Sequence, residues 1–267
     1  SQVEWILHDS GARLVFVEDQ VKATLVRGVL DGSGLLAGRV LGVVRMDYDG
    51  AAPNLASLAA AGSGVSDAEL ERQRRTAGLD DVASLVYTSG TTGRPKGCEI
   101  THGNFALVAK NIVLFLQEIL LQDRTRTLMF LPLAHVLARA VQVVCLSAGT
   151  TLGHTSSAKE LLEDLGTFKP TFLLVVPRIF EKVYAGAAQK AAQAGKERLF
   201  GAAAAVAIGY SQALDAAARG EGPGPGWGLR AKHRLFDRLL YPKLRQAFGG
   251  SLGYTVSGAS PLSANDA

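Results

Sequence analysis

The sequence predicts an α/β fold in which mainly parallel sheets are flanked by helices, and three observations support this. Short apolar runs rich in β-branched residues alternate with helical patterns along all 267 residues. The chain is 48% apolar and only 7% aromatic, with abundant alanine and glycine, which suits helices packed closely on a sheet. A glycine-rich loop also follows one apolar run, where parallel sheets bind their ligands.

The expected strands are short runs, and most lie between helical patterns. The run Val82–Val86 is entirely without charge, so we expect it to form a buried parallel strand. The predicted strands, in chain order, are Leu14–Val17, Val40–Val44, Ser84–Tyr87, Thr127–Leu131, Thr171–Val176 and Leu252–Val256.

The expected helices are recognised by apolar spacing and by capping residues. Thr101 is a good N-cap, and Pro177 suits a first helical turn because its missing N–H is not needed there. The predicted helices include the chain start around Val3–Leu7, His102 to about Leu121, Ser156 or Ser157 to Leu165, and a helix from Pro177 that carries Ile179, Phe180 and Val183.

Three further segments are assigned from composition. Residues 47–64 and 219–228 are rich in glycine and proline and are expected to be loops. The Ala-rich stretch Leu199–Gly209 is too short to cross a membrane and is expected to be a buried helix. No segment approaches eighteen uninterrupted apolar residues, and Glu4, His8 and Asp9 interrupt any signal peptide at the start.

Charge and cysteine content narrow the functional class. The formal charge of +4 gives no case for nucleic-acid binding. The two cysteines, Cys98 and Cys145, have no metal-type spacing, which favours a reduced, cytoplasmic protein without disulfides or a metal centre.

Residues 229–248 combine positive charge with an apolar face. Six cations stand there against the single acid Asp237, and leucines and a phenylalanine occupy the other side. A surface helix with solvated charges is one interpretation. Contact with an anionic membrane surface, at the inner face of the membrane, is the other.

Thr88–Gly97 has the chemistry of a phosphate-binding loop. Glycines allow backbone N–H groups to turn toward an anion, hydroxyls add neutral donors, and Lys96 adds a mobile positive charge. A Walker loop is disfavoured because Lys96 is followed by glycine and not by Ser or Thr. A plain surface turn would need only one or two special residues. The candidate phosphate-binding residues are Thr88, Ser89, Gly90, Thr91, Thr92, Gly93, Lys96 and Gly97.

The order of residues in this loop resembles the signature of the adenylate-forming superfamily, which includes acyl-CoA synthetases, luciferase and peptide-synthetase adenylation domains. Three later segments extend the resemblance to bacterial long-chain fatty acid–CoA ligases. They are Leu131–Val136, Val176–Val183 and Ser257–Leu262, and they occur in the family's order. The third is a variant, since Ala259 and Ser260 stand where the family more often has Gly and Ala.

The resemblance implies a two-step reaction with ATP, Mg²⁺ and coenzyme A. A fatty carboxylate would attack ATP to give an acyl-adenylate, and the coenzyme A thiol would then displace AMP. Lys96 and Thr88 would be catalytic, Lys96 binding the β/γ-phosphates, and Arg94 would be exposed and without a role. Gly258, Ala259 and Ser260 would meet the nucleotide, and His135 would line the acyl or nucleotide site.

The resemblance covers residues 1–267 as a partial AMP-binding domain, an internal piece of the family's large N-terminal domain. The segment whose glutamate holds Mg²⁺ and the small C-terminal domain are not found in it, so the chain alone is expected to be inactive. Two alternatives stay open: transfer of the acyl group to a carrier protein, and a binding module without chemistry. Acyl length and oligomeric state are not determined by the sequence.

Overall fold

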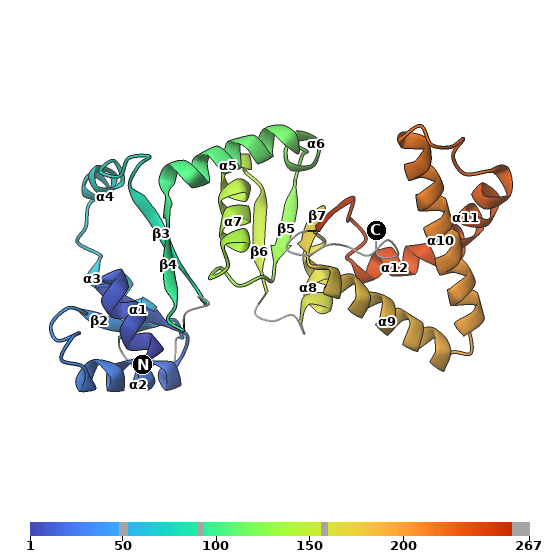
Figure 1. The fold of residues 1–267 in the computed structure, drawn as a ribbon. Coiled ribbons are helices and arrows are strands. Elements are labelled where there is room, and N and C mark those ends of the chain that lie inside the picture. The colour runs from blue at the N-terminus through green and yellow to red at the C-terminus, as the bar shows by residue number, and fades with distance from the viewer. Residues whose placement is uncertain (48–52, 90–92, 156–159, 258–267) are drawn as a thin grey trace. The chain divides into compact units, whose positions relative to one another are not determined.

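The structure is a computed structural model that describes residues 1–47, 53–89, 93–155 and 160–257. It divides into two compact units. The first comprises Ser1–Val108 with Ala134–Val136, and the second comprises Ala109–Leu133 with Leu137–Ala267. Within these described residues the strands form four two-stranded sheets, three of them parallel, and helices alternate with the strands along the chain (Figure 1). The predicted α/β class is therefore confirmed.

The first unit opens with a parallel β-α-β arrangement. Ser1 caps the first helix by accepting a hydrogen bond from the Glu4 N–H, so Ser1 lies before the helix and not within it. A small core of Leu7, Val26, Leu36 and neighbouring side chains joins helices to sheet. The elements are α1 (Gln2–Ser10), β1 (Leu14–Val17), α2 (Gln20–Gly32) and β2 (Gly42–Arg45).

The predicted loop at residues 47–64 is wrong in part, because it contains α3 (Leu55–Ala61). Asn54 caps this helix through its side-chain oxygen, which accepts from the Ser57 N–H at 2.9 Å. The glycine and proline content hid a short alanine-rich helix. It is followed by α4 (Asp67–Arg74), which is stabilised by exposed ion pairs along its own surface.

A hairpin replaces the buried parallel strand expected at Val82–Val86. β3 (Val82–Thr88) pairs antiparallel with β4 (Lys96–Thr101), and both faces of β3 keep exposed positions. The prediction was wrong because an uncharged run has the same pattern in a half-exposed hairpin as in a buried strand. β4 was missed because Ile100 is its only large aliphatic side chain.

A helix follows the hairpin directly after β4 (Figure 1). Thr101, the last residue of β4, caps this helix. Its hydroxyl accepts from the Asn104 N–H at 3.1 Å, and the Asn104 side chain accepts from the Thr101 N–H at 3.0 Å. This confirms the predicted cap. The helix ends earlier than predicted: α5 (His102–Phe115) stops before Leu116, and a short α6 (Gln117–Leu120) completes the span.

The second unit contains two parallel strand pairs that are linked by hydrogen bonds between Arg126 and Thr171. The Thr171 N–H donates to the Arg126 carbonyl at 2.9 Å, and the Arg126 N–H donates to the Thr171 hydroxyl at 3.0 Å. Leu165, Leu173 and Val175 are fully buried in the core beside this junction. The elements are β5 (Arg126–Met129), α7 (Val136–Ala148), β6 (Thr151–His154), α8 (Leu161–Phe168), β7 (Phe172–Val175) and β8 (Tyr254–Ser257).

Two predicted helix starts in this unit have different outcomes. The cap proposed at Ser156 or Ser157 lies outside the described residues, and α8 begins at Leu161 without a side-chain cap. Pro177 stands at the first helical position, as predicted.

The last helices lie between β7 and β8 in the chain: α9 (Pro177–Gln193), α10 (Glu197–Ala218), α11 (Trp227–Leu239) and α12 (Tyr241–Ala247). The segment 229–248 is thus two helices that meet at Leu240. The irregular stretch expected at 219–228 is confirmed as far as Gly226.

α10 departs from its prediction as a buried helix, because Phe200 and Ala203 are its buried residues among those described. Alanine has little apolar surface, so an Ala-rich helix gains little from docking deeply. Within the described part of the chain, α10 is also the one helix long and apolar enough to cross a membrane, by length and composition only.

Candidate functional site

The antiparallel register places the two predicted catalytic residues opposite each other. Thr88, the last residue of β3, pairs with Lys96, the first residue of β4. Directly opposite residues in an antiparallel pair project from the same face. Both side chains are exposed, as is Ser89. The hydroxyl of Thr88 and the ammonium group of Lys96 are therefore available together at the loop end of the hairpin.

The second arm of the loop, residues 93–95 just before β4, is anchored to α1. The Trp5 indole N–H donates to the Pro95 carbonyl at 2.9 Å, and the Arg94 guanidinium carbon lies 5.0 Å from the centre of the Trp5 ring. Gly93 precedes these contacts with a φ of 91°, which other residues rarely adopt. Arg94 is exposed as expected, but it packs on Trp5 through a cation–π contact and so has a structural role.

The first arm, the end of β3 that leads into the loop, is anchored to the same helix. The Tyr87 hydroxyl donates to Asp9 Oδ2 at 2.6 Å. Burial and the adjacent carboxylate raise the pKa of Tyr87 to about 12, because both disfavour the phenolate. Gly97, opposite Tyr87, makes room for this ring: a Cβ there would lie 3.0 Å from Tyr87 Cζ. α1 therefore holds both arms of the loop.

The anchoring residues Trp5 and Asp9 were not identified from the sequence. They lie far along the chain from the loop, and no local pattern links them to it. The one feature that could have pointed to them is the presence of an aromatic residue and an acid on a short helix beside the positions of its apolar face.

Of the other predicted site residues, His135 is described by the structure and six residues are not. His135 is exposed, directly precedes α7, and belongs with the hairpin to the first unit. Gly90, Thr91 and Thr92 lie outside the described residues, as do Gly258, Ala259 and Ser260. The strand that leads to the latter three, β8, forms as predicted and runs parallel to β7.

A metal site requires several ligating side chains close together. Among residues 1–47, 53–89, 93–155 and 160–257, no three His, Cys, Asp or Glu side chains are grouped to hold an ion. We therefore assign no step to the metal.

Comparison with known proteins gives a consistent picture. The chain is 47% identical over 264 residues to the long-chain-fatty-acid–CoA ligase FadD15 of Mycobacterium tuberculosis, which covers 98% of this chain and 42% of that protein. It is 36% identical over 191 residues to the peroxisomal long chain acyl-CoA synthetase 6 of Arabidopsis thaliana, covering 69% of this chain and 24% of that one. The chain thus spans less than half the length of these relatives.

Solved structures agree on the fold. The ATP-bound crystal structure of MatB from Rhodopseudomonas palustris matches 68% of this chain and 33% of its own with a TM-score of 0.52 at 24% identity. The family model described as AMP-binding enzyme matches residues 1–267. The chain belongs to the AMP-binding enzyme family.

Proposed function

We propose that the protein carrying this chain activates a long-chain fatty acid with ATP and transfers the acyl group to coenzyme A. The observation that carries the proposal is the pairing of Thr88 with Lys96 at the mouth of a loop of glycines and hydroxyls. The relative named as a long-chain-fatty-acid–CoA ligase, at 47% identity, and the one named as a long chain acyl-CoA synthetase, at 36%, support the choice of substrate.

In the first step, a carboxylate oxygen bonds to the α-phosphorus of ATP and the bond to the β-phosphate oxygen breaks. Negative charge grows on the departing pyrophosphate. An ammonium group and hydroxyls already aimed at that charge lower the barrier, since they need little reorganisation. We propose that Lys96 binds the β/γ-phosphates and that Thr88 and Ser89 donate hydrogen bonds to the phosphates. Gly90, Thr91 and Thr92 complete the loop, and Gly93 and Gly97 shape it.

In the second step, the thiol of coenzyme A releases its proton to solvent, its sulfur bonds to the acyl carbon, and AMP leaves with the electron pair of the broken C–O bond. No covalent enzyme intermediate is needed, so the exposed Cys98 is not required as a nucleophile. Gly258, Ala259 and Ser260 are proposed to meet the nucleotide. His135, exposed at the start of α7, is proposed to line the acyl or nucleotide site. Mg²⁺ would neutralise phosphate charge when bound.

The test is acyl-dependent exchange of labelled pyrophosphate into ATP, measured on the full-length protein with acids from C8 to C18. Lys96→Ala should lower the exchange rate by about 100-fold or more, because it removes a donor to the developing charge. Lys110→Ala, which removes an exposed lysine from α5, is the matched control and should leave the rate unchanged.

Each alternative has its own outcome. Exchange followed by transfer to a carrier-protein thiol and not to coenzyme A would favour the carrier-directed ligase. ATP binding without exchange for any acid would favour the non-catalytic module, and full exchange in Lys96→Ala would remove the proposed role of the loop.

We also propose that the protein is cytoplasmic and contacts an anionic membrane surface through residues 229–248. Leu235 and Leu239 are 55% and 60% exposed on α11, and Trp227 at its start is 86% exposed. The single acid, Asp237, is paired with Arg245 at 2.6 Å, which leaves a net excess of cations. Vesicle flotation tests this: binding should require anionic lipid and weaken in Leu235→Ser/Leu239→Ser. Equal binding by the variant, or by neutral vesicles, would reject it.

A further inference from the structure

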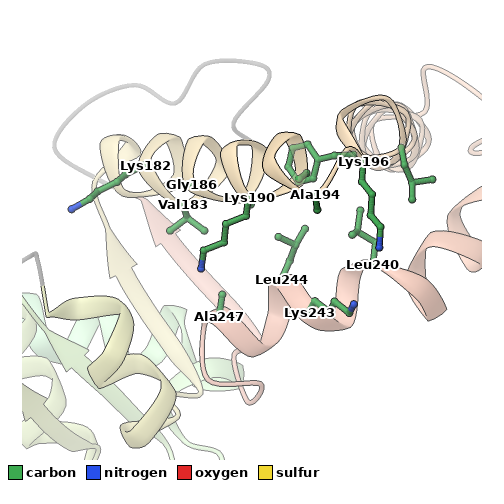
Figure 2. Close-up of a pocket in the computed structure, with 14 residues that line it drawn as sticks. Lys182, Val183, Gly186, Lys190, Ala194, Lys196, Leu240, Lys243, Leu244 and Ala247 are labelled. Atoms are coloured by element: carbon green, nitrogen blue, oxygen red, sulfur yellow. The ribbon is translucent and has the colours of Figure 1, made fainter.

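A groove in the second unit lies between α9, the start of α10 and α12 (Figure 2). Its volume is about 480 Å³, within the range of sites for small organic ligands. The residues that line the groove belong to the second unit, whereas the hairpin belongs to the first. Nothing in the proposed adenylation chemistry uses it.

Four lysines line this groove and come from three segments. Lys182 and Lys190 lie on α9, Lys196 immediately precedes α10, and Lys243 lies on α12. In Figure 2, Lys190 and Lys196 extend toward α12, whereas Lys182 points away from it. All four are exposed.

No acid balances these lysines within the groove. The lining residues include no Asp or Glu, and in the described part of the chain none of the four ammonium groups forms an ion pair. Like charges around one concave surface repel each other, and a concave, low-dielectric wall strengthens their field. The groove therefore favours an anion.

The floor between the lysines is apolar. Phe200 is 7% exposed, and Val183, Leu240 and Leu244 are half-buried around it. A second cavity of about 280 Å³ shares these side chains. Apart from two tyrosine hydroxyls, its lining side chains are entirely apolar.

The walls of the groove are fixed to each other by specific contacts. The Tyr241 hydroxyl donates to the Ala203 carbonyl at 2.9 Å, which ties α12 to α10. The rings of Tyr184 and Phe200 lie 5.3 Å apart, which ties α9 to α10. The groove is thus formed before any ligand arrives, so binding need not order its walls.

We infer that this groove is a binding site for a single-chain anionic amphiphile, with its carboxylate or phosphate head among Lys190, Lys196 and Lys243 and its alkyl chain on the floor around Leu244. The cations select the charge of the head, and the apolar floor favours ligands with an alkyl chain over ligands that are polar throughout, such as inorganic phosphate. A concave site also suits one molecule better than the flat surface of a bilayer. The inference is independent of the adenylation reaction.

The experiment is photo-crosslinking of the full-length protein with a palmitate analogue that carries a diazirine on its chain, followed by mass spectrometry of the labelled peptides. Label is expected on α9 and α12, and palmitate should compete for it whereas hexadecanol, which lacks the charge, should not. Lys190→Glu/Lys243→Glu should lower this labelling at least tenfold. Lys110→Glu, an exposed lysine of α5 outside the groove, is the matched control.

The outcomes separate this site from the proposed active site. Lys96→Ala should keep the α9 and α12 label, and the double charge reversal should be checked for folding by circular dichroism. The neutral variant Lys190→Gln/Lys243→Gln should show an intermediate loss. Label absent from α9 and α12, label unchanged by charge reversal, or label that appears only with vesicles would overturn the inference. Absence of pyrophosphate exchange in the unsubstituted protein, with this label present, would reject only the adenylation proposal.

Discussion

The Tyr87 hydroxyl donates a 2.6 Å hydrogen bond to the Asp9 carboxylate, and the two residues are 78 positions apart in the sequence. The contact joins the first helix of the chain to the strand that leads into the candidate phosphate loop. Together with the bond from Trp5 to the Pro95 carbonyl, it fixes both arms of the hairpin to one helix. The mouth of the loop is therefore positioned by side chains outside the loop itself.

The first prediction concerns Tyr87→Phe. Folding raises the pKa of Tyr87 to about 12 from its ordinary 10, so between these values the unfolded chain loses the proton first. The tyrosine's contribution to stability is therefore complete below pH 10 and is lost as the pH rises through 12. Urea unfolding of both proteins at several pH values should show a difference of about 1 kcal/mol at pH 8 that shrinks toward pH 12. A difference that stays constant would contradict it.

Gly97→Ala should destabilise the first unit. The new methyl group would lie 3.0 Å from Tyr87 Cζ, so the ring must shift away from Asp9. We expect a loss of about 1–3 kcal/mol in the free energy of unfolding. Gly28→Ala in α2 is the matched control: nothing lies within 4 Å of its added Cβ, and alanine should stabilise the helix by about 0.4–1 kcal/mol. Equal effects at both positions would count against the steric role of Gly97.

Thr88→Val should separate activity from stability. Thr88 is exposed at the end of β3, so the free energy of unfolding should change by less than about 0.5 kcal/mol. The exchange rate of pyrophosphate should fall about tenfold or more, since a hydrogen bond to a charged phosphate contributes about 1.5–3 kcal/mol. Thr24→Val on α2, also exposed, should leave exchange unchanged. An unaffected rate in Thr88→Val would remove Thr88 from the site.

The two thiols should differ in reactivity. Cys98 is exposed, whereas Cys145 is 1% exposed and burial raises the pKa of its thiol to about 11. At pH 8 a disulfide reagent should therefore modify Cys98 rapidly and Cys145 only after unfolding. Titration with such a reagent, with and without denaturant, checks this. The variant Cys98→Ser should show no fast phase, and rapid modification of Cys145 in it would contradict the buried position.

The sequence was informative where local patterns decide the structure. The α/β class, the Thr101 cap and Pro177 at a first helical turn depend on neighbouring residues, and all three are confirmed. The direction of β3 was mistaken because strand pairing depends on the partner strand, and β4 has few strand-forming residues.

The contacts that hold the candidate site in place could not be predicted from the sequence. Asp9 and Trp5 act on the loop across 78 and 90 positions, so only the folded chain brings them to Tyr87 and Pro95. The exposure of α10 was missed for a different reason, because alanine occurs equally well on buried and exposed helix faces. The roles assigned to the loop residues and to His135 stay predictions.

The pairing of β7 with β8 has a consequence for how the chain folds while it is being synthesised. β3 and β4 meet across a short loop, so the hairpin can close as soon as β4 leaves the ribosome. β7 must wait until all of α9, α10, α11 and α12 has been translated before its parallel partner exists, a delay of several seconds at ordinary elongation rates. During that interval the edge of β7 that later pairs with β8 stays unpaired and can pair with another chain.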